Sequence, residues 1–144
     1  MKTKVRDWMT PRPVTIDATA SVLEALQLLK EKRIRRLPVT RRGKLVGLVT
    51  DTMLVSHSAG PGASLDAWEV AHLLSTKLVS EIMDPYPHSV APDTDLAQCA
   101  PLIRDRSLGG GLTVLDDNGN LVGILTTTNA LEALIWFCRQ VHRL

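Results

Sequence analysis

The strongest constraint on the fold is a phrase that the chain contains twice. The stretches VGLVTDTML at 46–54 and VGILTTTNA at 122–130 share a Val-Gly pair, an apolar pair and a Thr. They lie 76 positions apart in a chain of 144 residues. Self-similarity of this kind indicates an internal duplication, in which each half of the chain builds the same supersecondary unit.

The duplication extends through most of both halves. The segment VRDWMTPRPVTI at 5–16 aligns with VSEIMDPYPHSV at 79–90 at an offset of 74, and 21–34 aligns with 95–108 at the same offset. After one inserted Gly and a one-residue gap, the repeated phrase itself follows at an offset of 76. Two repeats with the same order of apolar runs and Pro or Gly punctuation are therefore predicted.

The sequence pattern of each repeat predicts strands and helices in the order β-α-β-β-α. A Met-x-Pro-x-Pro turn leads into a short strand, and a helix with an apolar face follows. The capping box Ser21-x-x-Glu24 marks the start of this helix in the first repeat, and Asp95-x-x-Gln98 is a close variant in the second. A hairpin and a last helix complete each repeat. The predicted strands are 14–16, 37–40 and 45–50, then 89–90, 112–115 and 121–126, and the last helix covers about 128–141.

The two repeats are separated by a segment that breaks regular structure. Gly60-Pro61-Gly62 interrupts the chain, and Ser64 is a suitable N-cap for a helix that follows. The sequence thus divides into a first repeat at 1–57, a linker and helix at 58–78, and a second repeat with a C-terminal helix at 79–144. Pro101 removes a backbone hydrogen bond from the helix beginning near Asp95, which predicts a kink or a shifted start.

With these residues in view, each half resembles a CBS motif, the repeat named after cystathionine β-synthase, and the pair resembles a Bateman module. The doubled order is similar to that of small stand-alone bacterial CBS pairs, including the acetoin-utilisation-type proteins. The resemblance implies a mixed α/β (α+β) fold with two repeats packed about a pseudo-twofold axis. It also implies a non-enzymatic regulatory module that binds AMP, ADP or ATP in clefts between the repeats and forms a homodimer. The motifs are Met9-Thr10-Pro11, 34–39, 47–50, Met83-Asp84-Pro85, Gly109-Gly110 and 123–129.

The resemblance implies one well-formed nucleotide site. In the family, a Thr or Ser at the end of a strand and an Asp or Asn three positions later bind phosphate and ribose; here these are Thr126 and Asn129. Asn keeps an acceptor but lacks the charge of Asp, so we expect weaker ribose binding. Eight of the 17 Lys and Arg residues lie at 30–44, beside the expected phosphate. The predicted nucleotide-binding residues are Thr10, Val14, Thr15, Ile16, Ile34, Arg35, Arg36, Pro38, Thr126 and Asn129.

The matching site of the first repeat departs from the family pattern. Thr50 is present, but the residue three positions later is Met53, whose thioether is a poor hydrogen-bond acceptor. The walls expected from the second repeat offer few cations, and Asp84 would repel phosphate. We therefore predict a weaker second site. Its candidate residues are Thr50, Asp51, His88, Gly109 and Gly110.

Other functions find less support in the residues. The four His residues form no recognised spacing with Cys or carboxylates, so neither a catalytic site nor a metal site is predicted, and no cofactor is required. The basic segment 30–44 contains no aromatic residue on which bases could stack, which disfavours nucleic-acid binding. No apolar run is long enough to cross a membrane. We expect a cytoplasmic protein in which Cys99 and Cys138 are free thiols.

One alternative stays open beside nucleotide binding. The C-terminal helix carries more apolar side chains, between Leu131 and Val141, than a lone outer helix requires. Part of this surface can pack on the repeats, and the remainder can form a dimer or bind an unknown regulated protein. The alternative is therefore a ligand-free protein-interaction or dimerisation module whose nucleotide sites have decayed.

Overall fold

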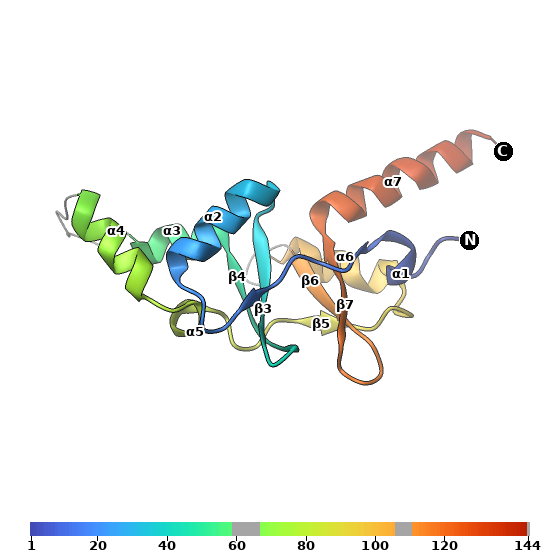
Figure 1. Ribbon diagram of the computed structural model, residues 1–144. Coiled ribbons are helices and arrows are strands. Elements are labelled where there is room, and N and C mark those ends of the chain that lie inside the picture. Colours follow the sequence, from blue (N-terminus) through green and yellow to red (C-terminus); the bar gives the residue numbers. More distant parts are fainter. Residues whose placement is uncertain (59–66, 106–110, 144) are drawn as a thin grey trace. The chain divides into compact units, whose positions relative to one another are not determined.

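The structure is a computed structural model that describes residues 1–58, 67–105 and 111–143 (Figure 1). The chain forms two compact units, each described here by itself. We call residues 14–86 the central unit, and residues 1–13 together with 87–144 the terminal unit.

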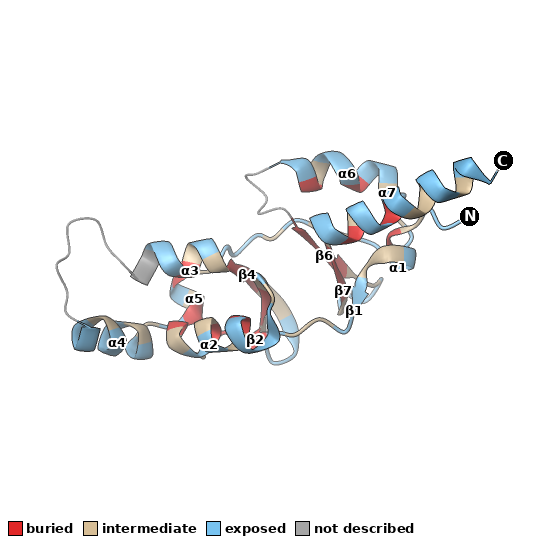
Figure 2. Cartoon of the chain, turned by 90° about the horizontal axis from the view of Figure 1, so that it is seen from above, coloured by how far each residue is buried: buried red, intermediate tan, exposed pale blue. Residues whose placement is uncertain are grey.

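The central unit places helices around a three-stranded sheet. Its strands follow the order β2 (Ile16–Asp17), β3 (Arg36–Arg41) and β4 (Lys44–Thr50), with β2 parallel to β3 and β3 antiparallel to β4. Its helices are α2 (Val22–Lys32), α3 (Asp51–Ser58), α4 (Ala67–Thr76) and α5 (Val79–Ile82). The buried side chains lie on the sheet and on the faces of α2, α3 and α5 that meet it (Figure 2).

The terminal unit has a four-stranded sheet with the order β1 (Thr10–Pro11), β7 (Leu121–Thr126), β6 (Gly111–Leu115) and β5 (Ser89–Val90). Its helices are α1 (Val5–Trp8), α6 (Leu96–Arg104) and α7 (Thr127–His142). The buried core joins α1 and α6 to the sheet through Val5, Cys99, Ile103, Leu112, Val114 and Leu125. Both units thus contain the predicted β-α-β-β-α order, which confirms the fold class.

The two hairpins close with different turns. In the central unit, Arg42 and Gly43 both have positive φ, at 52° and 78°, as a two-residue turn between paired strands requires. In the terminal unit the connection is longer, and the Asp116 carboxylate accepts hydrogen bonds from the backbone N–H groups of Asn118 and Asn120 at 2.9 Å. The backbone of Arg42 therefore adopts a left-handed conformation, which Gly and Asn adopt more readily than Arg.

The leading segment of each repeat packs with the other repeat. Val5 is fully buried in the terminal unit, and its N–H donates to the Thr94 carbonyl at 3.0 Å. Val79, its counterpart at the offset of 74, is fully buried in the central unit, and its N–H donates to the Ala20 carbonyl at 2.8 Å. The compact units therefore cut across the repeats at 1–57 and 79–144, an exchange that the alignment of the repeats does not reveal.

Each exchanged segment runs close to a glycine of the strand that it joins. Thr10 and Pro11 pair with Ile124 and Gly123, and Asp84 forms the equivalent bridge to Leu48, next to Gly47. A Cβ atom at Gly123 would lie 2.5 Å from the Met9 sulfur, and one at Gly47 would lie 2.8 Å from the Asp84 carbonyl oxygen. The Gly of the repeated phrase thus provides the space in which the other repeat's segment is held.

The helix starts differ in one respect from the sequence prediction. The capping box of Ser21 and Glu24 is formed as expected. The Asp95 variant is not, because the Asp95 carboxylate instead binds the Lys4 ammonium at 2.7 Å and caps no N–H group. Helix α6 nevertheless begins at Leu96 and continues through Pro101, so its start is not shifted. The predicted cap at Ser64 lies outside the described residues, and both cysteines are free thiols.

We predict that Gly47→Ala destabilises the protein more than Gly123→Ala. A Met sulfur is the nearest atom at both positions, but the new methyl group at Gly47 would also lie 2.8 Å from the Asp84 carbonyl oxygen, whereas the Thr10 carbonyl oxygen would be 3.1 Å from the one at Gly123. Overpacking of this kind costs about 1–3 kcal/mol, and urea denaturation measures it.

Variants that combine a glycine substitution with truncation of the neighbouring methionine test why the two glycine substitutions differ in cost. Met9→Ala should relieve much of the cost of Gly123→Ala, while Met83→Ala should relieve less of the cost of Gly47→Ala. Equal relief in both halves would contradict the role assigned to the Asp84 carbonyl group.

Candidate functional site

A polar cluster forms where β7 passes into α7 in the terminal unit. Thr126 ends the strand, Asn129 lies in the first turn of the helix, and Thr10 lies on the paired strand β1. The Asn129 Oδ1 atom accepts hydrogen bonds from the Thr126 N–H at 2.9 Å and from the Thr126 hydroxyl at 3.2 Å. We call Thr10, Thr126 and Asn129 the terminal corner.

The orientation of the Asn129 amide follows from its partners. The backbone N–H of Thr126 is only a donor, so the amide oxygen must face it. The Nδ2 atom then donates to the Thr10 hydroxyl oxygen at 3.4 Å. Asn129 is only 7% exposed, and helix capping already uses its acceptor atom. Thr126 thus engages the acceptor atom of Asn129 in this structure, and the role of Asn129 toward ribose stays a prediction.

The central unit contains an equivalent corner with different chemistry. Thr50 ends β4, and its hydroxyl accepts the N–H of Met53 at 3.2 Å. At the offset of 74, Asp84 takes the place of Thr10, and its carboxylate accepts the N–H of Tyr86 at 2.9 Å. Met53 supplies no amide between them. We call Thr50, Met53 and Asp84 the central corner; the repeat offset of 74 matches Asp84 to Thr10, and Asp84 is the acidic residue that the sequence predicts beside the second site.

The other predicted nucleotide-binding residues belong to the central unit. Ile16 and Pro38 are buried, with Ile16 in the core. Val14 and Ile34 are half-buried and pack against the same core. Their side chains therefore stabilise the fold, and only their backbones or edges can face a ligand. Thr15 and Arg35 are exposed, and Arg36 is half-buried.

The basic segment 30–44 does not form one patch. The register pairs Arg36 with Thr50 at one end of the β3–β4 hairpin and Arg41 with Lys44 at the other. Five residue steps along a strand separate Arg36 from Arg41 by roughly 17 Å. Only the basic residues near Arg36 therefore lie at the end of the hairpin that carries the central corner.

Arg36 is a half-buried charged residue at this end of the sheet. Burial lowers the pKa of its guanidinium, and the nearby Asp51 carboxylate partly offsets that effect while Arg35 adds to it. Arginine nevertheless stays protonated, because its pKa is normally above about 12. The backbone also ties the two segments together, since the Asp51 N–H donates to the Arg35 carbonyl at 2.9 Å.

The residues of the predicted second site are distributed between the units. Thr50 and Asp51 belong to the central unit, whereas His88 is an exposed residue of the terminal unit. Its carbonyl accepts the N–H of Thr113 at 3.2 Å. Gly109 and Gly110 lie outside the described residues.

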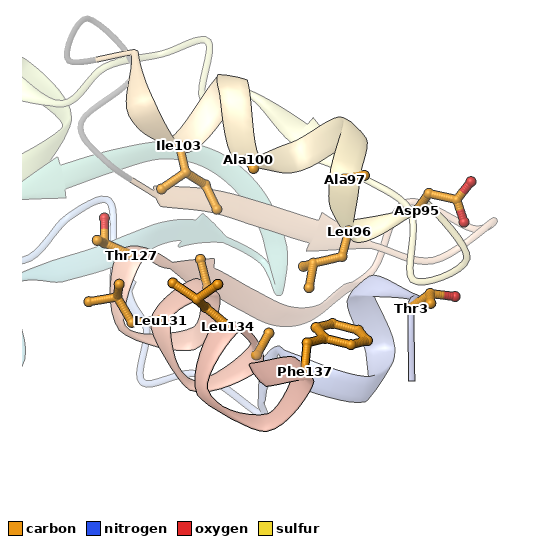
Figure 3. A pocket seen from close by; sticks show the side chains of 12 residues that line it. Thr3, Asp95, Leu96, Ala97, Ala100, Ile103, Thr127, Leu131, Leu134 and Phe137 are labelled. Carbon is orange, nitrogen blue, oxygen red and sulfur yellow. The ribbon is translucent and has the colours of Figure 1, made fainter. Parts of the chain in front are cut away.

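A separate apolar cavity of about 680 Å³ lies between α6 and α7 in the terminal unit (Figure 3). Leu96 and Ile103 of α6 and Leu131 and Leu134 of α7 point into it from its two sides. Leu134 is 57% exposed although it lines the cavity. The remaining lining residues are Thr3, Asp95, Ala97, Ala100, Thr127, Ala130, Ala133 and Phe137.

Comparison with known proteins agrees with this architecture. The CBS domain model matches residues 5–60 and again 79–135. The chain belongs to the CBS domain family. Its two CBS domains form a tandem pair, and the matching model is not that of a catalytic family. Among the described helices, none has the length and apolar character needed to span a membrane.

Three similar proteins illustrate the family. The chloroplastic CBS domain-containing protein CBSX2 of Arabidopsis thaliana is 33% identical over 96% of this chain, which spans 66% of the length of CBSX2. A crystal structure of CBSX2 in complex with AMP has a TM-score of 0.76 at 35% identity, covering 94% of this chain and 98% of that one. A putative acetoin utilization protein from Vibrio cholerae has a TM-score of 0.79 at 26% identity, covering 100% and 98%. The CBS domain of the bacterial CNNM/CorC Mg²⁺ transporter in complex with ATP has a TM-score of 0.73 at 25% identity, covering 92% and 87%.

We predict that Asn129→Ala lowers the free energy of unfolding by about 1–2 kcal/mol, because the N–H of the half-buried Thr126 loses its partner. Thermal or urea denaturation measures the change. Thr128→Ala is the matched control, since Thr128 is an exposed residue of the same helical turn. It should change stability by less than about 0.5 kcal/mol, and an equal loss in both variants would contradict the capping role of Asn129.

Proposed function

We propose that this protein is a regulatory CBS pair that binds an adenosine nucleotide of the AMP, ADP or ATP class. The observation that carries the proposal is the terminal corner, where three polar side chains from two segments meet beside the first turn of α7. Helix N-termini and hydroxyl groups favour phosphate. The complexes of CBSX2 with AMP and of the CNNM/CorC domain with ATP support the choice of ligand.

We propose Arg35 and Arg36 as the cations of the central unit that bind the ligand phosphates. Arg35 is exposed, and Arg36 keeps its charge in a half-buried position. Thr10, Thr126 and Asn129 contribute polar groups, and the backbones of 14–16, Ile34 and Pro38 contribute contacts to the base. The site with Thr50, Asp51 and His88 binds more weakly, because Met53 replaces the amide and Asp84 brings a negative charge. We also propose a cytoplasmic location and no enzymatic activity.

We further propose that the protein forms a homodimer in which a second copy covers the cavity between α6 and α7. The repeat offset supports this assignment. In the central unit, α2 and α3 correspond to α6 and α7, and helix α4 packs against both of them. Exposed apolar side chains line the corresponding face of the terminal unit, and a second copy would bury them. If nucleotides fail to bind, this dimerisation surface is the observation that favours the interaction-module alternative.

We predict saturable binding of at least one of AMP, ADP, ATP and S-adenosylmethionine in calorimetric titrations. Arg35→Ala should weaken the binding about tenfold, the loss expected for one charge-assisted hydrogen bond. Arg41→Ala is the matched control, because it removes an exposed arginine from the other end of β3. Absence of heat with all four compounds, for folded protein, would reject the proposed function, and equal losses in both variants would reject the role of Arg35.

We predict that Leu134→Glu shifts the protein from dimer to monomer in size-exclusion chromatography with light scattering. The charge would be placed in the apolar cavity that the second copy covers. Val141→Glu is the matched control, because Val141 is 66% exposed on the same helix and does not line the cavity. A wild-type monomer, or equal dissociation of both variants, would contradict the proposed interface.

A further inference from the structure

We propose that Asn129 presents hydrogen-bond donors, and no acceptor, to a ligand at the terminal corner. This site then selects nucleotides by an acceptor atom on the ribose. The inference rests on the proposed function and specifies how its ligand is chosen. It concerns only Thr10, Thr126 and Asn129, which all belong to the terminal unit.

The hydrogen bonds that Asn129 forms within the protein leave only a hydrogen-bond donor of its amide group for a ligand. An amide oxygen has two lone pairs, and the N–H and the hydroxyl of Thr126 occupy both. The amide nitrogen has two hydrogens, of which one is directed to the Thr10 hydroxyl oxygen. The Thr10 hydroxyl accepts this bond, which leaves its own hydrogen for a further acceptor. A ligand at this corner therefore meets the second Asn129 hydrogen and the Thr10 hydroxyl hydrogen.

The fold opposes a reversal of this amide. Turning the side chain over would place the Nδ2 hydrogens against the backbone N–H of Thr126, which cannot accept a hydrogen bond. Asn129 is 7% exposed, so little water is available to replace the lost partner. The donor polarity of the corner is thus fixed by the start of α7, the element that positions the side chain.

An aspartate at position 129 would present different hydrogen-bonding groups to a ligand than Asn129 does. A carboxylate at this position can accept the Thr126 N–H with one oxygen and a ribose hydroxyl hydrogen with the other. With Asn129, a ribose hydroxyl can only accept, and a ribose phosphate offers better acceptors at the same place. Because a hydrogen bond from the neutral amide is weaker than one to a carboxylate, we infer that this chain discriminates less against deoxyribose than Asn129→Asp does and that it tolerates an adenosine nucleotide that carries a 2′- or 3′-phosphate.

The test compares wild-type protein with Asn129→Asp by calorimetry. The ligands are AMP, 2′-deoxy-AMP, 3′-deoxy-AMP and adenosine 3′,5′-bisphosphate. In Asn129→Asp, the preference for AMP over at least one deoxy compound should rise fivefold or more. The affinity for the bisphosphate relative to AMP should fall at least tenfold, because the new carboxylate repels the added phosphate. Comparing ratios removes the steric contribution of the extra group.

Thr128→Asp is the matched control, because it adds the same charge to an exposed position of the same helical turn. It should leave the preference for AMP over the deoxy compounds unchanged and lower the bisphosphate ratio less than Asn129→Asp does. Asn129→Asp should remain folded, since its carboxylate can still accept the Thr126 N–H near the positive end of α7. Thermal denaturation verifies this before the titrations.

The outcomes separate the two proposals. Equal ligand preferences in wild-type and Asn129→Asp protein would overturn the inference and leave nucleotide binding intact. Binding by Asn129→Asp alone would reject nucleotide binding by the natural chain, and the inference, which rests on that binding, would fail with it. If neither protein binds any of the compounds, the proposed function fails and the inference fails with it.

Discussion

The burial of Val5 and Val79 in the opposite repeat is the interaction on which the rest of the structure depends. Each valine is fully buried, and each is followed by a segment that crosses a glycine of the strand it joins. Without the exchange, each core would lose a fully buried apolar residue, and each hairpin would lose the segment paired to its last strand. The duplication therefore produces two units that each combine segments of both repeats, the central unit within residues 14–86 and the terminal unit from residues 1–13 and 87–144.

The exchange also assembles the terminal corner. Thr10 reaches Asn129 because the β1 segment pairs with β7, and that pairing needs Gly123 to admit Met9. A change at Gly123 can thus alter the polar groups that a ligand would meet at the terminal corner. The central corner has the same backbone plan, yet Met53 and Asp84 remove the amide and add a charge. Two corners with the same backbone plan therefore differ in chemistry through two side chains.

Sequence periodicity was sufficient to predict the strands, hairpins and main helices, because apolar alternation and turn residues act locally. It could not predict which repeat each leading segment joins, since Val5 and Val79 satisfy the same pattern in either arrangement. The sequence predicts a helix cap at Asp95, whereas its carboxylate binds Lys4, a residue 91 positions away. The basic segment 30–44 was continuous in sequence but is divided by the length of β3. These differences share one cause: contacts between segments that are distant in the sequence produce no recognisable pattern in the residues around each segment.

The hydrogen bonds of Asn129 give its side chain a polarity that the sequence does not reveal. Asn129 was expected to accept a hydrogen bond from ribose, because an amide contains both a donor and an acceptor. The choice between them is made by Thr126, whose N–H binds the amide oxygen and turns the donor outward. In a buried corner, the group that caps the helix thereby decides which group remains for the ligand. Asp and Asn can cap α7 equally well at this position, yet they leave opposite polarities for whatever binds beside Thr10.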